Sequence, residues 1–221
     1  GCRVEVDAFS YGIDDPMTIA GIAPGALQFA VDRFAQGFGP QTPNVLSEAI
    51  VADSAGDIFL NVNFLPPGPL PPGPSVGHRG VLDGDGMVSG SGFAYMGLGL
   101  IEPAPPVSTP VNPGDNLDAM DTLAASAIPG PDVYYSLDAV HPDPLSGFPN
   151  LGSALPYGFT GADILKSTFG FPPVLYANEW QLGLGLSGLA DDVDAMILVE
   201  NGNGTFQPSQ TPFDWVGGTT D

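Results

Sequence analysis

Basic side chains are scarce in this chain of 221 residues. Only four Lys and Arg residues stand against 25 Asp and Glu residues, which gives a formal net charge of −21 at pH 7. A negative field of this size repels nucleic acids and anionic lipid surfaces, and it attracts cations. We therefore expect no nucleic-acid partner. We also expect a divalent cation to neutralise carboxylates that lie close together, because Lys and Arg are too few to do so.

The residues of several common reaction types are also missing. Cys2 is the single cysteine, and the two histidines, His78 and His141, do not have zinc-ligand spacing. The sequence contains neither a nucleophile elbow nor a phosphate-binding glycine loop. No apolar run approaches the roughly 18 residues of a membrane-spanning helix. We expect a protein that does not span a membrane and is not an enzyme.

Glycine and proline are abundant instead. The 31 Gly and 25 Pro residues separate short runs of β-branched and aromatic residues, which predicts an all-β fold with many turns and long loops. Because 43% of the residues are hydrophobic and only 13% are charged, the chain is not a disordered acidic tail. The scarcity of Lys and the Gly/Pro-rich loops favour an extracellular or cell-surface location, where calcium is plentiful.

Two sequence motifs occur twice in one register. The segment at 29–32 (Phe-Ala-Val-Asp) matches that at 135–138 (Tyr-Ser-Leu-Asp). The segment at 56–59 (Gly-Asp-Ile-Phe) matches that at 162–165 (Ala-Asp-Ile-Leu). Both pairs are separated by 106 positions, and two separate motifs rarely align in one register by chance. The pattern predicts an internal repeat.

A third motif extends the repeat and occurs three times. The segment at 115–120 (Asp-Asn-Leu-Asp-Ala-Met) matches 191–196 (Asp-Asp-Val-Asp-Ala-Met), and 4–9 (Val-Glu-Val-Asp-Ala-Phe) is a third copy. A Leu-Gly-Leu segment at 98–100 precedes the copy at 115–120, and another at 182–184 precedes the copy at 191–196. We refer to the three Asp-Ala copies as the Asp-Ala motifs.

We therefore expect two pseudo-repeated, β-sandwich-like modules with long Pro/Gly-rich loops. The proline-rich stretch 65–74 favours an extended polyproline conformation, and we expect it to be a surface excursion outside the core. The expected units are a partial repeat and loop at 1–25, unit one at 26–128 with its insertion at 64–92, unit two at 129–200, and a tail at 201–221 that begins a further partial unit.

Hydrophobic alternation predicts the individual strands. Residues 44–52 favour a short helix capped by Asn44, with a strand as the alternative. The expected strands are 3–9, 27–32, 57–63, 117–128, 133–138, 163–167, 174–184 and 193–199.

The repeated acidic residues are the candidate metal ligands. Carboxylate and amide oxygens near loops suit the irregular oxygen shell of calcium, so we predict Ca²⁺ as the bound ion. The alternative for any one of these residues is that its side chain caps a turn through Asx hydrogen bonds. The predicted ligands are Asp32, Asp57, Asp115, Asn116, Asp118, Asp138, Asp163, Asp191, Asp192 and Asp194.

The repeated motifs together resemble a known kind of protein. In order they read Phe-x-[Val/Leu]-Asp, Gly-Asp-Ile, Leu-Gly-Leu and Asp-Asp-Val-Asp-Ala-Met. This series resembles a tandem module of secreted bacterial proteins and, more loosely, subunits of calcium-stabilised extracellular filaments. The resemblance implies an extracellular, β-rich, ion-binding scaffold and supplies no catalytic residue. Asn116 in place of Asp192, and Ala162 in place of Gly56, depart from the pattern.

These observations predict a secreted, calcium-binding structural protein. Residues 4–9 resemble the closing strand of one unit and 213–215 the opening strand of another, so copies could assemble head to tail into a filament or a surface layer. A monomer closed by its own two ends is the alternative assembly. The alternative function is a carbohydrate-binding module or a glycan-active secreted enzyme, with Trp180 or Trp215 stacking on a sugar.

Overall fold

The chain folds into strands joined by long connections. A computed structural model describes residues 6–10, 28–32, 35, 37, 42–51, 53–61, 78–86, 95–101, 115–122, 132–138, 152–168, 171–184, 193–198 and 203–211. The proline-rich stretch 65–74, the opening residues 1–5, and the aspartates 191 and 192 lie outside this part, as do residues 213–215.

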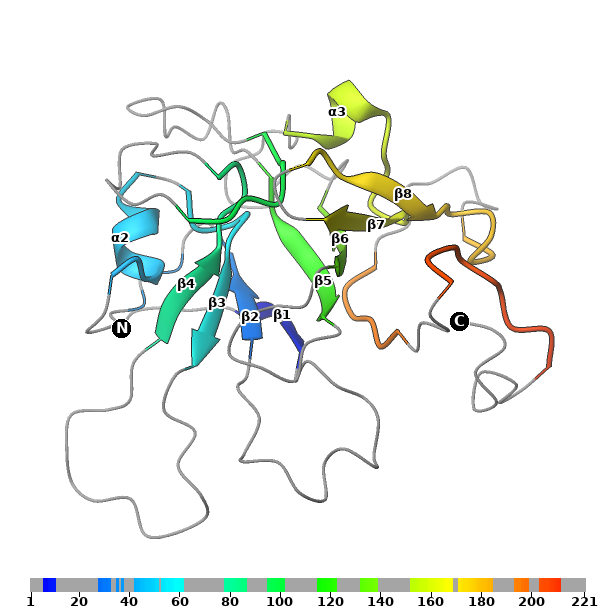
Figure 1. Cartoon of the computed structure of the whole chain (residues 1–221), viewed down its shortest axis with the longest axis horizontal. Helices are drawn as coiled ribbons and strands as arrows, with labels where there is room; N and C mark the ends of the chain where they lie inside the picture. The colour runs from blue at the N-terminus through cyan, green and yellow to red at the C-terminus, as the bar shows by residue number, and fades with distance from the viewer. Residues whose placement is uncertain are drawn as a thin grey trace, which may run out of the picture.

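Two four-stranded antiparallel sheets make up the fold (Figure 1). The first has the order β1-β2-β3-β4, with strands at Val6–Ser10, Gln28–Val31, Ile58–Asn61 and His78–Leu82. The second has the order β5-β6-β7-β8, with strands at Leu117–Thr122, Asp132–Leu137, Ile164–Thr168 and Val174–Ala177. The helices are short: α2 at Val45–Ala49 and α3 at Ala154–Tyr157. The prediction of an all-β fold is confirmed.

The two sheets share irregularities as well as strand order. The pairing of β1 with β2 shifts register between Val6 and Ala8, and the pairing of β5 with β6 shifts between Leu117 and Ala119. The third strands also match, because register shifts after Ile58 in β3 and after Ile164 in β7. Each shift leaves an extra residue on one strand, as in a β-bulge, and falls on a repeated motif.

The loops after the fourth strands also correspond. The Leu100 N–H donates to the Gly84 carbonyl at 2.8 Å, and the Leu184 N–H donates to the Glu179 carbonyl at 2.8 Å. These pairs are 16 and 5 positions apart, so this connection in the first sheet carries 11 extra residues. The β3–β4 hairpin is also 11 residues longer than the β7–β8 hairpin. Ile58 pairs with Leu82, 24 positions later, whereas Ile164 pairs with Ala177, 13 positions later.

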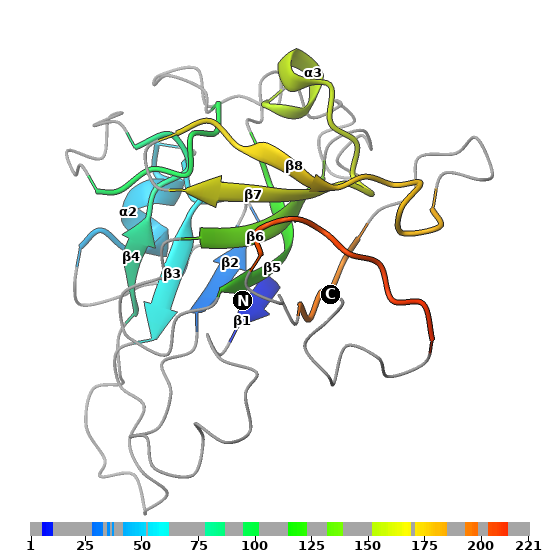
Figure 2. The same cartoon turned by 45° about the vertical axis from the view of Figure 1, so that its right-hand side comes forward.

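The two sheets lie next to each other (Figure 2), and they share one hydrophobic core. Burying apolar side chains from both sheets in one cluster contributes roughly 1.5–3 kcal/mol for each large side chain and binds the sheets together. The first sheet and its following loop contribute Ala8, Ala30, Ile58, Leu82, Leu98 and Leu100, and the second contributes Leu117, Met120, Val133, Tyr135, Leu137 and Leu165.

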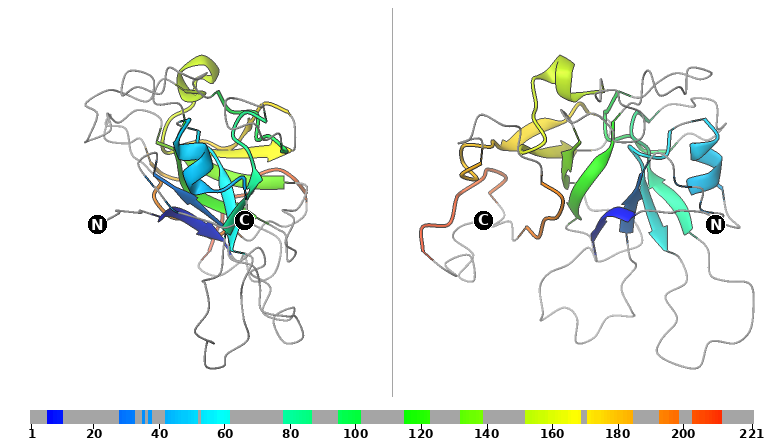
Figure 3. Two further views of the ribbon diagram at one scale, coloured as in Figure 1. Left: turned by 90° about the vertical axis from the view of Figure 1, so that its left-hand side faces the viewer. Right: turned by 180° about the vertical axis from the view of Figure 1, so that it is seen from behind.

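The first strands of the two sheets lie side by side. Figure 1 and Figure 3 both show β1 next to β5, with the other strands of each sheet extending away on either side. We call the place where β1 meets β5 the seam. The extended segment 193–198 lies on the β5 side of the seam, where the Leu198 N–H donates to Asp121 at 2.8 Å. The three Asp-Ala motifs therefore meet at one place in the fold.

Helix α2 forms as its sequence predicts. Asn44 accepts a hydrogen bond from the Ser47 N–H at 3.0 Å, and Ser47 Oγ accepts one from the Asn44 N–H at 2.8 Å, which completes a capping box. In the part of the chain that is described, no helix is long and apolar enough to cross a membrane.

Two strand predictions are wrong. The strand expected at 174–184 ends at Ala177, because Asn178 and Gln181 exchange side-chain-to-backbone hydrogen bonds that form a turn. The segment 193–198 is extended but joins no ladder. It is held instead by single bonds, among them the Ser136 hydroxyl to the Val193 carbonyl at 2.7 Å.

The strand pairing also groups the chain differently from the expected units. The strand at 6–10 belongs to the first sheet, because β1 pairs with β2. The strand at 117–122 pairs with β6 and opens the second sheet, whereas the expected boundary placed it at the end of unit one. Antiparallel strands joined consecutively along the chain form hairpins, and this neighbour pairing determines the grouping.

Candidate functional site

The aspartates before β3 and β7 hold equivalent loops. Asp57 Oδ1 accepts the Gly84 N–H at 2.9 Å, and Asp163 Oδ1 accepts the Glu179 N–H at 2.9 Å. Their second oxygens are also engaged, Asp57 by the Tyr95 hydroxyl at 2.7 Å and Asp163 by the Thr160 N–H at 2.9 Å. Both carboxylates therefore stabilise loops through hydrogen bonds, which is the Asx-type role weighed as the alternative to calcium binding.

Asp57 lies among other carboxylates. Burial raises its pKa well above the ordinary value, and the nearby Asp83 and Asp53 raise it further. Burial likewise raises the pKa of Asp83 to about 8, although its Oδ1 accepts the Gly86 N–H at 2.9 Å. A carboxyl with a pKa near 8 holds a proton through much of the neutral range, and this relieves the repulsion between the two aspartates.

Asp115 connects two loops. Its carboxylate accepts the Ser153 N–H at 2.7 Å and the Ile101 N–H at 3.2 Å. Burial is the main cause that raises its pKa to about 6. The side chain packs so closely against Gly152 that a Cβ there would lie 2.0 Å from Asp115 Oδ1. This aspartate is therefore committed to the loops and is 1% exposed.

Asn116, just before β5, and Asp138, just after β6, lie opposite each other on neighbouring strands of the second sheet. Leu117 pairs directly with Leu137, and the Asp138 N–H donates to the Asn116 carbonyl at 3.0 Å. Directly opposed residues on antiparallel strands place their side chains on the same face, with Cβ atoms about 4.5–5.5 Å apart. Asn116 Oδ1 is buried and accepts no hydrogen bond from the described residues. Asp118 follows at the β5 bulge and is half-buried.

The remaining predicted ligands are dispersed. Asp32 follows β2, and its carbonyl accepts the Ala35 N–H at 2.8 Å. Asp194 is exposed in the segment 193–198, and residues 191 and 192 lie outside the described part. Within the described ranges, no three His, Cys, Asp or Glu side chains are close enough together to hold a metal ion. The predicted ligands thus form separate groups, of which the Asn116–Asp138 pair places two directly opposite each other.

Sequence reasoning missed the residue at the centre of the seam. Asp121 is 5% exposed and accepts the Ser10 hydroxyl at 2.8 Å and the Thr122 N–H at 2.7 Å on Oδ1. Its Oδ2 accepts the Leu198 N–H. Ser10 and Asp121 each directly follow an Asp-Ala motif, but this shared position does not predict that the two residues are in contact.

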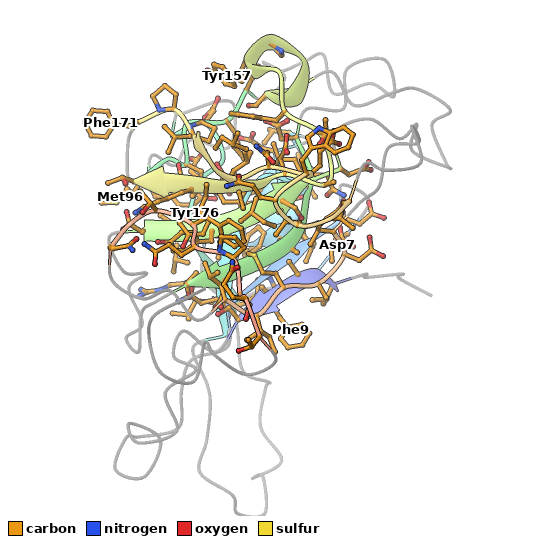
Figure 4. The ribbon with its side chains drawn as sticks, turned by 90° about the vertical axis from the view of Figure 1, so that its right-hand side faces the viewer. Asp7, Phe9, Met96, Tyr157, Phe171 and Tyr176 are labelled. Carbon is orange, nitrogen blue, oxygen red and sulfur yellow. The ribbon has the colours of Figure 1, made fainter. Side chains whose placement is uncertain are left out.

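An open pocket of about 440 Å³ also lies at the seam. All three Asp-Ala motifs line it, with Asp7 to Ser10 on one wall, Ala119 to Asp121 on a second and Asp194 to Ile197 on a third. Phe9 is 58% exposed, and Figure 4 draws its ring at the margin of the packed side chains. The pocket has a mostly apolar wall with carboxylates among its lining residues.

Comparisons with known proteins leave the chain without a demonstrated relative. No family model, curated protein or solved structure matches it. The resemblance to secreted modular proteins therefore stays a prediction.

Proposed function

We propose that this protein is a secreted, calcium-binding structural protein that assembles with copies of itself, and that it is not an enzyme. Its two sheets are two copies of one four-stranded module, running from 6 to 100 and from 117 to 184, and together they form a sandwich-like arrangement around their shared core. The segment 193–198 is the opening of a third copy. The shared strand order and the matching bulges at Asp7 and Asp118 support this division.

The pair formed by Asn116 and Asp138 is the observation that carries the calcium proposal. Ca²⁺ takes six to eight oxygen ligands from carboxylates, amide oxygens and water. A buried amide oxygen that accepts no hydrogen bond from the described residues is costly, and a cation would compensate that cost. Asp118, at the adjacent bulge, would supply a further carboxylate, and water would complete the shell.

The use of the other aspartates supports a structural role. Asp57, Asp115, Asp121 and Asp163 each accept backbone N–H groups that hold loops or segments in place. Carboxylates committed in this way stabilise the fold and are not positioned as acids or bases in an open cleft. The charge of −21 would oppose self-assembly, and bound calcium would reduce that repulsion.

A calcium titration with matched variants tests the proposal. The intact chain should gain thermal stability with calcium and lose it in EDTA, because a ligand at a hundredfold excess over its dissociation constant adds about 2.7 kcal/mol. Asp138→Asn and Asn116→Ala should reduce the calcium-induced shift. Glu179→Gln removes one negative charge just after β8, the edge strand of the second sheet that lies farthest from β5, and should keep the shift. Equal responses of Asp138→Asn and Glu179→Gln would contradict a site at this pair.

A further inference from the structure

One backbone contact between the two sheets occurs a second time in the molecule. In the first contact, the Leu117 N–H of β5 donates to the Ala55 carbonyl at 3.1 Å, and in the second the Val193 N–H donates to the Gly161 carbonyl at 3.2 Å. Leu117 and Val193 hold the same position in their Asp-Ala motifs. Ala55 and Gly161 directly precede the matching segments 56–59 and 162–165. Donor and acceptor are therefore equivalent in the two contacts.

A second hydrogen bond is repeated in the same way. The Thr122 N–H donates to Ser10 Oγ at 3.3 Å, and the Leu198 N–H donates to Asp121 Oδ2 at 2.8 Å. Thr122 and Leu198 each lie four positions after the aspartate of their own motif, and Ser10 and Asp121 each lie three positions after theirs. The segment 193–198 therefore lies on the second sheet as β5 lies on the first.

The second sheet buries apolar side chains on both of its faces. Tyr135 belongs to the core shared with the first sheet, whereas Tyr134 belongs to a separate cluster with Leu198. Successive side chains of a strand point to opposite faces of the sheet. Val193 and Met196 pack against the cluster around Tyr134. The segment 193–198 thus covers the face of the second sheet that points away from the first sheet, which we call the outer face.

Strand β1 exposes the side chains that β5 buries in its contact with the first sheet. Leu117 and Met120 are fully buried in the shared core. Val6 and Phe9 occupy the same positions of the motif in β1 and are 52% and 58% exposed. Helix α2 joins β2 and β3 in a buried cluster through Val45, and these two side chains of β1 are not part of it. An exposed apolar pair at these positions indicates a surface for docking.

We propose that β1 of a second copy docks on the outer face of the second sheet and replaces the segment 193–198 there. The inference rests on the proposed self-assembly and specifies its interface. Strand β5 stays paired with β6 while it contacts the first sheet, so β1 can dock without leaving β2. The Val6 N–H of the second copy takes the Gly161 carbonyl, and Phe9 packs where Met196 lies. The segment 193–198 is then a cap that a second copy displaces.

The interface joins two different surfaces, the exposed side of β1 and the outer face of the second sheet. Such a heterologous contact repeats from copy to copy and produces either a closed ring or an open filament.

Hydrogen exchange in the intact chain tests the replacement of one strand by the other. When the chain assembles in millimolar calcium, the amides of 6–10 should exchange at least about tenfold more slowly and those of 193–198 at least about tenfold faster. The paired amides of β6 and β7 are the internal reference. Assemblies with unchanged exchange at both segments would overturn this interface and leave self-assembly standing. A chain that stays a single copy would overturn both.

Matched variants separate β1 from other exposed apolar surface. Phe9→Ser should weaken self-association at least about tenfold in sedimentation velocity, because it removes the aromatic ring that docking buries. Phe171→Ser is the control, since Phe171 is 67% exposed three residues before β8 and should leave association unchanged. Met196→Ser loosens only the cap and should strengthen association at least about threefold. Equal weakening by the two Phe variants, or weaker association of Met196→Ser, would overturn the proposal.

Discussion

The Ser10 hydroxyl donates a 2.8 Å hydrogen bond to Asp121 Oδ1, and this bond joins β1 of one sheet to β5 of the other. The same carboxylate accepts the N–H of Leu198, so a single side chain connects three segments far apart in the sequence. Each segment carries an Asp-Ala motif or directly follows one. The repeated motif therefore marks the place where the parts of the chain meet.

Asp121→Ala should be strongly destabilising. The substitution leaves the buried Ser10 hydroxyl and the Leu198 N–H without the carboxylate that accepts them, and it leaves the Thr122 N–H with only its longer 3.3 Å bond to Ser10 Oγ, at a cost of about 3 kcal/mol or more. Asp132→Ala is the matched control, because Asp132 forms a partly exposed ion pair with Lys166 at 3.0 Å and should cost about 1 kcal/mol or less. Urea unfolding curves measure both, and equal losses would contradict the role given to Asp121.

Gly99→Ala and Gly183→Ala should differ in their effect on stability, although each glycine is the middle residue of a Leu-Gly-Leu motif. Both have positive φ, +80° and +77°, so each substitution costs about 1–2 kcal/mol in backbone strain. A Cβ at Gly99 would also lie 2.3 Å from the carbonyl oxygen of Phe171, whereas the surroundings of Gly183 are open. We expect Gly99→Ala to lower the free energy of unfolding by at least about 2 kcal/mol more. Similar values would contradict the packing of the two sheets.

Stability should fall as pH rises from about 4 to about 8. Burial raises the pKa of Asp83 to about 8, above the ordinary 3.8, so the folded state binds a proton that the unfolded state releases. That contribution is fully present below pH 4 and is lost as pH rises through the folded pKa. Asp83→Asn can still accept the Gly86 N–H and should flatten this part of the curve. Denaturant unfolding at a series of pH values checks it, and an unchanged slope in the variant would be contrary evidence.

His78 should oppose that trend on the acid side. Its Nε2 accepts the Val45 N–H at 3.1 Å at the start of α2, and its ring packs edge-on against Phe29 and Phe59. Burial lowers its pKa below the ordinary 6.5, so its contribution is present above pH 6.5 and is lost as pH falls through the folded pKa. NMR titration of the His78 ring should give a midpoint below 6.5. A midpoint above 6.5 would mean that the ring does not accept this hydrogen bond.

Local sequence patterns predicted much of the fold. The strands at 28–31, 58–61, 132–137 and 164–168 fall where alternation of apolar residues places them, and Asn44 caps α2 as expected. Each of these strands, and the helix cap, is determined by residues that are close together in the sequence. The strand expected at 117–128 forms over Leu117–Thr122, and residues 123–128 lie outside the described part.

The contacts between distant segments were not predictable in the same way. The segment 193–198 has a strand-like composition, but its position is decided by Asp121 and Ser136, which are distant in sequence. The candidate ligands Asp57 and Asp163 occupy the same position in the matching segments 56–59 and 162–165, yet this match cannot distinguish a metal ligand from a carboxylate that accepts the N–H groups of a loop. That distinction depends on which backbone groups fold back toward each carboxylate.

Native mass spectrometry with and without calcium tests the central proposal most directly. In millimolar calcium the intact chain should retain at least one Ca²⁺ and form species larger than one copy, and a chelator should remove both the ion and the larger species. The Asn116→Ala, Asp138→Asn double variant should lose the ion while Glu179→Gln keeps it. An intact chain that carries no calcium and has one mass under both conditions would contradict a calcium-binding, self-assembling structural protein.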